Sequence, residues 1–275
     1  MLKQRVITAL IAVAVLLVVL FLVPARVAEA VIALLVLAGG WEWSGFLGRD
    51  SKETRIAYVV VLAVALGLVT WQAPTINGVL FQVALAWWVG ALIWIFFYPT
   101  EIPGAIRWIG GLLVLVPLYN ALIVLYHVSP FILLGALLIV WAADTGAFVA
   151  GKLFGRVKLA PQISPGKTWE GVVGGLATVG VLALAAAGLS DAKVAVLVPF
   201  CLAVACASVV GDLTVSMFKR TAGVKDSGSL FPGHGGVLDR IDSVAAAAPL
   251  FALGIGWAGM PMGTMSLAML VGTVQ

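Results

Sequence analysis

Long apolar runs separated by short polar gaps are the feature that most constrains how this chain can fold. A helix that crosses a bilayer needs about 20 mostly apolar residues, and runs of that kind follow one another through most of the 275 residues. Hydrophobic residues make up 63% of the chain and charged residues 10%, with a mean hydropathy of +1.15, which leaves too little polar surface for a soluble globule. The sequence therefore predicts an all-α, polytopic integral membrane protein with about nine transmembrane helices.

The expected spans end at charged residues or at breaks rich in Gly and Pro. They lie at 6–23, 27–47, 56–73, 78–97, 107–126, 130–150, 170–189, 193–213 and 243–260. The first run follows Lys3 and Arg5 as in a signal peptide, but it is longer than a typical apolar signal segment and no A-x-A-like site clearly follows, so we take it as the first span. The apolar tail from Pro261 to Gln275 is expected either to form a partial tenth span or to lie at the interface.

The distribution of basic residues predicts the orientation. If the N-terminus is cytoplasmic and nine spans alternate, 14 of the 16 Lys and Arg residues fall on the cytoplasmic side, and only Arg26 and Lys193 fall on the other. This agrees with the positive-inside rule.

We expect one membrane domain, because neither a sequence repeat nor a low-complexity linker divides the chain. Residues 1–140 supply N-terminal transmembrane helices, and residues 141–275 form a C-terminal, catalytic region with cytoplasmic loops at 151–169 and 212–242. The expected topology places these two loops at the same face of the membrane, where they can meet.

Charged residues are concentrated in the polar stretch 212–242. It holds four of the twelve carboxylates and four of the sixteen basic residues, although charge beside a bilayer is costly unless it is paired or functional. Asp239 and Asp242 are three positions apart and share one face if a helix begins there, and Asp212 can reach them if the chain folds back. Three hard oxygen donors without a Cys or His cluster favour Mg²⁺ over zinc.

Basic residues of the same stretch would neutralise phosphate oxygens near such a metal: Lys219, Arg220, Lys225 and Arg240. Acids, bases and metal together predict a phosphoryl- or nucleotidyl-transfer site, where positioning and charge stabilisation do most of the catalysis. The alternative is a solvated loop whose acids and bases pair with each other. His234, flanked by glycines, is a phosphate contact, a general acid or base, or a loop histidine that caps a helix.

The polar stretch 151–169 leads into Ser-Pro-Gly-Lys-Thr-Trp-Glu-Gly at 164–171, part of which resembles a P-loop. The comparison fails because a Walker motif needs Gly at the position of Pro161 and because nothing upstream reads as a strand. The run instead predicts a helix start at which Ser164 and Thr168 can act as caps. Lys167 near the positive helix terminus would suit an anionic ligand.

Three more ionisable residues belong to apolar segments. Asp144 lies about two turns inside the cytoplasmic end of its span and is expected to face the protein interior, as a site residue or as a buried hydrogen-bonded group. Glu42 lies between two Trp residues and is expected at the interface, in an aromatic belt. His127 is expected at the opposite membrane face and is given no function.

Several motifs in this region resemble the signature of the phosphatidate cytidylyltransferases, also called CDP-diacylglycerol synthases. They are SMFKR at 216–220, KDSG at 225–228 and FPGHGGVLDRID at 231–242. This run of 27 residues does not depart from the pattern, and SPGKTWEG with the regions near Asp144 and Lys152 extends the similarity over residues 141–243. The first 140 residues agree mainly in hydropathy.

The resemblance implies a reaction in which the phosphate of phosphatidic acid attacks the α-phosphorus of CTP, giving CDP-diacylglycerol and pyrophosphate with the assistance of Mg²⁺. The phosphate nucleophile is already anionic, so no strong general base is required. The metal-binding acids would be Asp212, Asp239 and Asp242, which form the catalytic set together with Lys219 and Arg220. The implied substrate-binding residues are Asp144, Ser164, Lys167, Thr168, Glu170, Lys225, Asp226, His234 and Arg240.

The expected partners are therefore CTP, phosphatidic acid and the lipid bilayer, and nucleic acid is not among them. A second cation such as K⁺ and a homodimer are compatible with the resemblance. With no eukaryotic targeting segment apparent, the expected location is a bacterial inner membrane, with the active site facing the cytoplasm.

Three rival functions follow from the same features. An enzyme with another lipid acceptor, such as a polyprenol or ether-lipid cytidylyltransferase or kinase, would differ in its product. A secondary transporter would bind its solute near the membrane midplane and often shows inverted repeats, whereas these charges gather at one membrane edge. A CDP-alcohol phosphotransferase needs a D-G-x-x-A-R type motif, which this chain lacks.

Overall fold

The computed structural model describes residues 2–48, 51–72, 75–190, 192–228, 230 and 235–255. His234 and the tail from Pro261 to Gln275 lie outside the described residues, so the expectations for them stay predictions. Within the described part, the chain forms α-helices and one small β-hairpin. The helices are α1 (Leu2–Phe21), α2 (Ala25–Trp43), the 3-10 helix η1 (Ser44–Phe46), α3 (Lys52–Gln72), α4 (Asn77–Phe97), α5 (Gly104–Val128), α6 (Pro130–Phe154), α7 (Trp169–Gly188), α8 (Val194–Thr221) and α9 (Leu238–Gly254).

Each of the nine expected spans falls on one of these α-helices. Among the described residues, seven helical segments, α2 through α8, are long and apolar enough to cross a membrane. The peripheral helices α3 and α4 carry large apolar side chains on their outer faces, including Val64 at 58% exposure and Phe96 at 74%. Such exposure is stable in lipid and not in water, so the architecture is that of a polytopic helical membrane protein.

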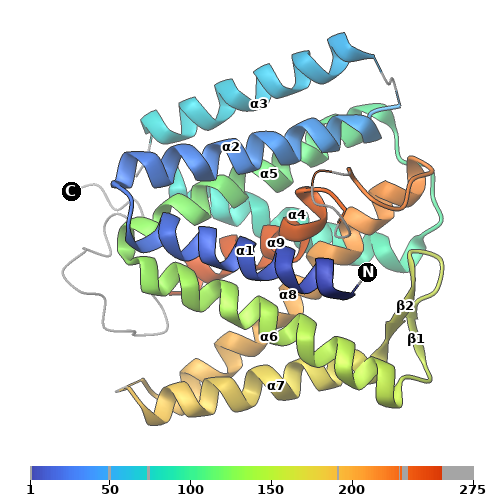
Figure 1. Ribbon diagram of the computed structural model, residues 1–275. Helices are drawn as coiled ribbons and strands as arrows, with labels where there is room; N and C mark the ends of the chain where they lie inside the picture. Colours follow the sequence, from blue (N-terminus) through green and yellow to red (C-terminus); the bar gives the residue numbers. More distant parts are fainter. Residues whose placement is uncertain are drawn as a thin grey trace.

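Helix α9 lies at the centre of the bundle, surrounded by α2, α4, α5, α6 and α8 (Figure 1). Thirteen of its seventeen residues are buried. The four consecutive alanines at 245–248 keep its surface narrow, and at Gly211 the neighbouring α8 approaches so closely that a Cβ there would collide with the carbonyl oxygen of Asp242. This packing places the acidic start of α9 beside α8.

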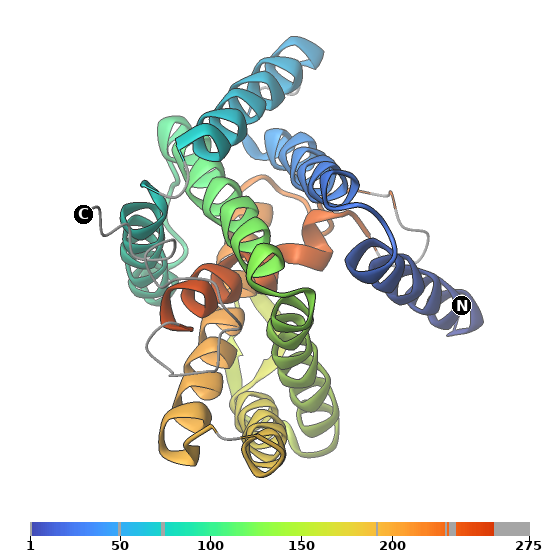
Figure 2. The same ribbon diagram turned by 90° about the vertical axis from the view of Figure 1, so that its left-hand side faces the viewer.

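Helices α6 and α7 run side by side, and both pack against α8 (Figure 2). Small residues line their seam. A Cβ on Gly174 would collide with the side chain of Ala150, and one on Gly175 would lie 2.6 Å from the carbonyl oxygen of Ala143. Small residues allow this close backbone approach, on which helix association in lipid depends.

The loop between α6 and α7 contains a β-hairpin, which corrects the expectation that no strand precedes the Gly-Lys-Thr run and leaves the all-α fold class unchanged. Strands β1 (Lys158–Ala160) and β2 (Ser164–Thr168) pair antiparallel. The predicted helix start is confirmed, because the Thr168 side chain accepts a hydrogen bond of 3.1 Å from the backbone N–H of Gly171 and caps α7. Ser164 lies in β2 and does not cap this helix.

Helix α8 is longer than the span expected at 193–213. It continues through the first ten residues of the polar stretch 212–242 and ends at Thr221. Asp212, Lys219 and Arg220 are therefore held on a helix, with Lys219 buried, and the chain leaves helical structure only after them.

Candidate active site

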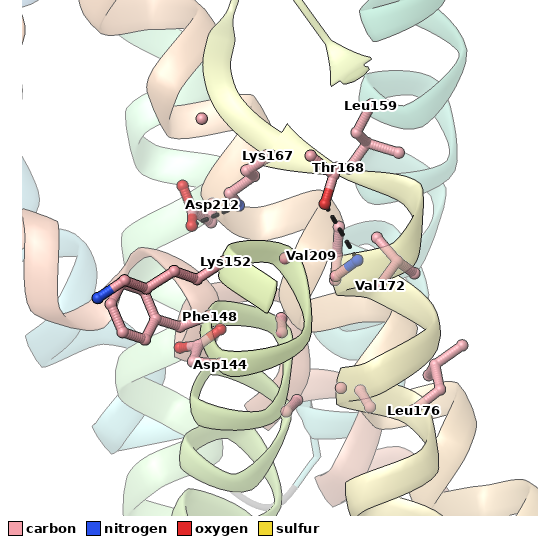
Figure 3. Close-up of a pocket in the computed structure, with 17 residues that line it drawn as sticks. Asp144, Phe148, Lys152, Leu159, Lys167, Thr168, Val172, Leu176, Val209 and Asp212 are labelled. Atoms are coloured by element: carbon pink, nitrogen blue, oxygen red, sulfur yellow. Dashed lines mark hydrogen bonds and ion pairs between the residues drawn. The ribbon is translucent and has the colours of Figure 1, made fainter. Parts of the chain in front are cut away.

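A pocket of about 340 Å³ lies between α6, α7 and α8, under the β-hairpin (Figure 3). Its walls are mainly small or apolar residues of the three helices, such as Ala147, Gly175 and Val209. Its polar groups are Asp144, Lys152, Lys167, Thr168 and Asp212. The pocket thus combines an apolar floor among membrane-spanning helices with charge near the hairpin.

An ion pair joins the hairpin to α8 at this pocket. The Nζ of Lys167 on β2 lies 2.5 Å from Oδ2 of Asp212, and the other Asp212 oxygen accepts a hydrogen bond of 3.2 Å from the Ser216 hydroxyl. The Lys167 and Asp212 side chains are 28% and 26% exposed. Both predicted residues therefore meet, and a ligand can reach them.

Asp144 lies deeper on α6, in the same pocket (Figure 3). It is close enough to Asp212 for the two carboxylates to repel each other, and Lys167 and Arg240 partly compensate that charge. One helical turn further along α6 are Phe148 and then Lys152, whose ammonium lies 5.9 Å from the Phe148 ring centroid. Of the two readings left open for Asp144, the pocket favours a site residue.

A second lysine, Lys219, lies in a more enclosed position between α8 and the start of α9. Its Nζ donates to Oδ1 of Asp239 at 2.7 Å and lies 3.9 Å from Oδ2 of Asp242. All three side chains are at most 10% exposed. Because a buried lysine is strongly disfavoured unless it is paired, the two carboxylates are needed to keep it there.

Asp239 also organises the backbone that precedes α9. Its Oδ2 accepts hydrogen bonds from the N–H groups of Ser227 at 3.0 Å and Gly236 at 2.9 Å. Burial would raise the pKa of Asp239, but the bonds from Lys219, Gly236 and Ser227 outweigh burial and hold that pKa below its usual value. Asp239 is therefore a charged acceptor fixed by three donors.

Asp242 completes the acidic group at the start of α9. One oxygen accepts a hydrogen bond of 2.8 Å from the backbone N–H of Ser243, and the carboxylate is repelled by the charge of Asp212. The fold-back thus brings Asp212 near enough to act electrostatically on Asp242, and Asp212 and Asp239 each have their own lysine.

No ready-made metal cage of three or more His, Cys, Asp or Glu side chains occurs among the described residues. The donors still suit Mg²⁺, which commonly binds through one or two carboxylates and completes its shell with water and substrate phosphates. Asp212 and Asp242 provide two mutually repelling carboxylates, each with a lysine within ion-pair distance. Asp239, held by three donors, is the least available of the predicted metal ligands.

Two other predicted residues form hydrogen bonds to the hairpin or to the residue just before it. Arg220 donates from Nε to the carbonyl oxygen of Ile163 at 2.9 Å, which links α8 to the turn between the strands. Glu170 accepts hydrogen bonds from the Val157 N–H at 3.1 and 3.2 Å. The structure places Ser164 on β2, close to the same turn.

The remaining predicted residues lie at the exposed edge. Lys225, Asp226 and Arg240 are exposed, with Arg240 near enough to act electrostatically on Asp144. They make none of the close ion pairs found among the described residues. His234 lies outside the described residues, and its role stays open.

Glu42 was assigned incorrectly from the sequence. It is not an interfacial residue, because it is only 8% exposed and its carboxylate accepts hydrogen bonds from the Ser227 hydroxyl and from the N–H groups of Val237 and Leu238. The adjacent Trp43 is completely buried, whereas Trp41 is 40% exposed. The available signal was a lone carboxylate in an apolar run, which needs a partner wherever it is buried.

Comparison with known proteins agrees with this geometry. The family model described as "Cytidylyltransferase family" matches residues 3–256. A phosphatidate cytidylyltransferase of Pseudomonas aeruginosa is 41% identical over 261 residues, covering 92% of this chain and 96% of the relative. One of Haemophilus influenzae is 37% identical over 283 residues, covering 91% and 97%, and one of Staphylococcus aureus is 48% identical over 120 residues, covering 43% and 46%.

The match therefore includes the N-terminal helices, for which the sequence motifs alone gave little information. A family model that spans most of the chain, together with relatives aligned over nearly their full length, establishes the relationship independently of the short motifs. The chain belongs to the cytidylyltransferase family.

Proposed function

We propose that this protein is a phosphatidate cytidylyltransferase, which transfers CMP from CTP to phosphatidic acid. The observation that carries the proposal is a largely apolar pocket lined by Asp144, Asp212 and Lys167, with Asp242 near enough to act electrostatically on Asp212 and paired with Lys219. The names of the relatives point to the same reaction. A nucleotidyl transfer to a lipid phosphate needs this combination of charge and apolar surface.

In the proposed reaction, an oxygen of the phosphatidate phosphate forms a bond to the α-phosphorus of CTP. The bond from that phosphorus to the bridging oxygen breaks, and pyrophosphate leaves with the electron pair. Lys167 can exchange its Asp212 partner for a phosphate oxygen because the pair is partly exposed. Lys219 stays between its carboxylates and keeps the inner edge of the site preorganised.

Mg²⁺ belongs to this proposal, with Asp212 and Asp242 as its principal protein ligands and Asp239 as a further prediction. When bound, the ion would neutralise phosphate charge during the transfer. The carboxylates themselves would hold the cation in place, and they would oppose anion binding in its absence. The second cation, such as K⁺, stays a prediction.

The proposed setting is a bacterial inner membrane crossed nine times, with the N-terminus and the active site on the cytoplasmic side. The supporting observations are the helices that the described residues form at the expected spans and the bias of Lys and Arg toward one side. CTP would then reach the hairpin from the cytoplasm, and the lipid would reach the pocket from the bilayer. The homodimer stays a prediction that light scattering of the purified protein would test.

The test measures formation of CDP-lipid and pyrophosphate from CTP and phosphatidic acid by purified protein in detergent, with and without Mg²⁺. We expect magnesium-dependent product from the wild type and at least about a hundredfold lower kcat in Asp242→Asn, which loses a buried carboxylate at the site. Parallel reactions with a polyprenyl phosphate and an ether lipid identify the acceptor. Folded wild-type protein that forms no product from phosphatidic acid would refute the proposal.

A further inference from the structure

We propose that Glu42, on the N-terminal helix α2, is a positioning residue for the pair formed by Lys219 and Asp239. Its carboxylate bonds to residues that either hold Asp239 or directly follow one that does. We call this set the Asp239 cradle and define it as Ser227 with Gly236, Val237 and Leu238. This inference rests on the proposed function, because the cradle belongs to that candidate active site.

Glu42 caps the central helix from a distant part of the chain. The N–H of Val237 donates to Oε1 at 2.9 Å, and the N–H of Leu238 donates to Oε2 at 2.8 Å. Val237 is the N-cap position of α9 and has no capping side chain of its own. Glu42 therefore satisfies donors at the positive end of α9, where a carboxylate is most strongly stabilised.

Glu42 and Asp239 divide the donors of the same cradle between them. The Ser227 hydroxyl donates to Glu42 at 2.7 Å, while the Ser227 N–H donates to Asp239 at 3.0 Å. The Gly236 N–H donates to Asp239, and the next N–H along the chain donates to Glu42. A shift of the Glu42 carboxylate must therefore move donors that hold Asp239.

The cradle has the shape that this carboxylate requires. A Cβ on Gly228 or on Gly236 would collide with the Glu42 carboxylate. Only glycine leaves enough room at these two positions. The close fit on two sides makes the position of Glu42 specific rather than incidental to helix packing.

The neighbouring Trp43 contacts the residue that precedes the other partner of the pair, Lys219. Its ring centroid lies 4.9 Å from that of Phe218, the residue that precedes Lys219 on α8. Trp43 also donates from Nε1 to the carbonyl oxygen of Arg107 at 2.9 Å, which fixes its ring. Consecutive residues at the end of α2 thus support the Asp239 side and the Lys219 side of the same ion pair.

The test compares Glu42→Gln with Glu29→Gln, which makes the same change on the same helix at a carboxylate 3.1 Å from Nε2 of His127. Steady-state kinetics with CTP, phosphatidic acid and Mg²⁺ are combined with hydrogen–deuterium exchange of each protein without substrates. We expect Glu42→Gln to lower kcat about tenfold or more, to change KM for CTP less than about threefold, and to speed exchange at residues 236–239. Glu29→Gln should match the wild type in all three measurements.

Ser227→Ala, which keeps the Glu42 carboxylate and removes one donor, should reduce kcat by a smaller factor. If Glu42→Gln has the kcat and the hydrogen–deuterium exchange rates of the wild type, the proposal is wrong. It is also wrong if exchange becomes faster throughout the bundle, because Glu42 would then have a general structural role. A change in KM alone would also overturn it. If the wild type itself forms no CDP-lipid, the proposed function fails, and the local exchange result still decides whether Glu42 holds the cradle.

Discussion

The candidate site contains two lysine–aspartate pairs that differ in burial and in what holds them. Lys167 and Asp212 join a hairpin to a helix and are 28% and 26% exposed, whereas Lys219 and Asp239 join two helices of the core and are 9% and 7% exposed. An exposed pair contributes little to stability and can exchange partners, but a buried pair is costly to break. We infer that the exposed pair handles ligands while the buried pair maintains the geometry.

Lys219→Met should have the largest effect, because it leaves Asp239 and Asp242 buried without their cation. Breaking such a pair costs about 3–5 kcal/mol, so both the thermal midpoint in detergent and kcat should fall sharply. Lys193→Met changes an exposed lysine at the other end of α8 and serves as the control. If the two variants melt at the same temperature, the buried pair does not have the structural role assigned to it.

Asp212→Asn should reduce activity strongly while leaving the fold nearly as stable as the wild type. We expect kcat/KM to fall on the order of a hundredfold and the free energy of unfolding to change by less than about 1 kcal/mol, as for other exposed pairs. A double-mutant cycle with Lys167→Met, measured by kinetics and by thermal melting, separates the two effects. If Asp212→Asn lowers the free energy of unfolding as much as Lys219→Met does, the exposed and the buried pair do not differ in structural role.

Gly174→Ala tests the α6–α7 seam, which adjoins the exposed site, without changing any charge. A methyl group in the α6–α7 seam collides with Ala150, and overpacking of this kind costs about 1–3 kcal/mol. Gly180→Ala is the matched control on the same helix, because a Cβ there meets nothing within 4 Å. Equal thermal midpoints for the two variants would show that the seam can spread at no cost.

The smallest expected effect is on the acid dependence of stability. The pKa of Asp239 is lowered in the folded protein, so its contribution is present above the pKa of the unfolded chain and is lost as pH falls through the folded value. The thermal midpoint of Asp239→Asn, measured from pH 7 to pH 3, should therefore fall less steeply than that of the wild type. If the thermal midpoints of the wild type and of Asp239→Asn fall equally steeply with decreasing pH, the pKa of Asp239 is not lowered by folding.

The helices were predictable because hydropathy is a local property. Within the described residues, each of the nine expected spans falls on a helix with boundaries within a few residues, except that α8 continues through Lys219 and Arg220 to Thr221. The polar sequence after residue 212 predicted a loop, but Lys219 remains in a helix because it pairs with two carboxylates of α9. Tertiary pairing therefore overrode the local signal.

The acidic residues were predictable as a group, but their individual partners were not. The spacing of Asp239 and Asp242 indicated a shared helix face, whereas the pairing of Asp212 with Lys167 depends on a hairpin of two very short strands. The role of Glu42 depends on donors 185 to 196 positions away in the sequence. Neither the Asp212–Lys167 pair nor the hydrogen bonds of Glu42 produce a periodic pattern in the nearby sequence.

The link between α2 and α9 has a consequence for biosynthesis. A ribosome completes α2 long before it makes α9, so the Glu42 carboxylate enters the membrane region with none of its eventual N–H partners in existence. An unpaired carboxylate is costly in hydrocarbon, which favours an early intermediate with the end of α2 held in water. Final burial of this helix end must therefore await the arrival of the central helix, and the middle of the bundle is assembled last.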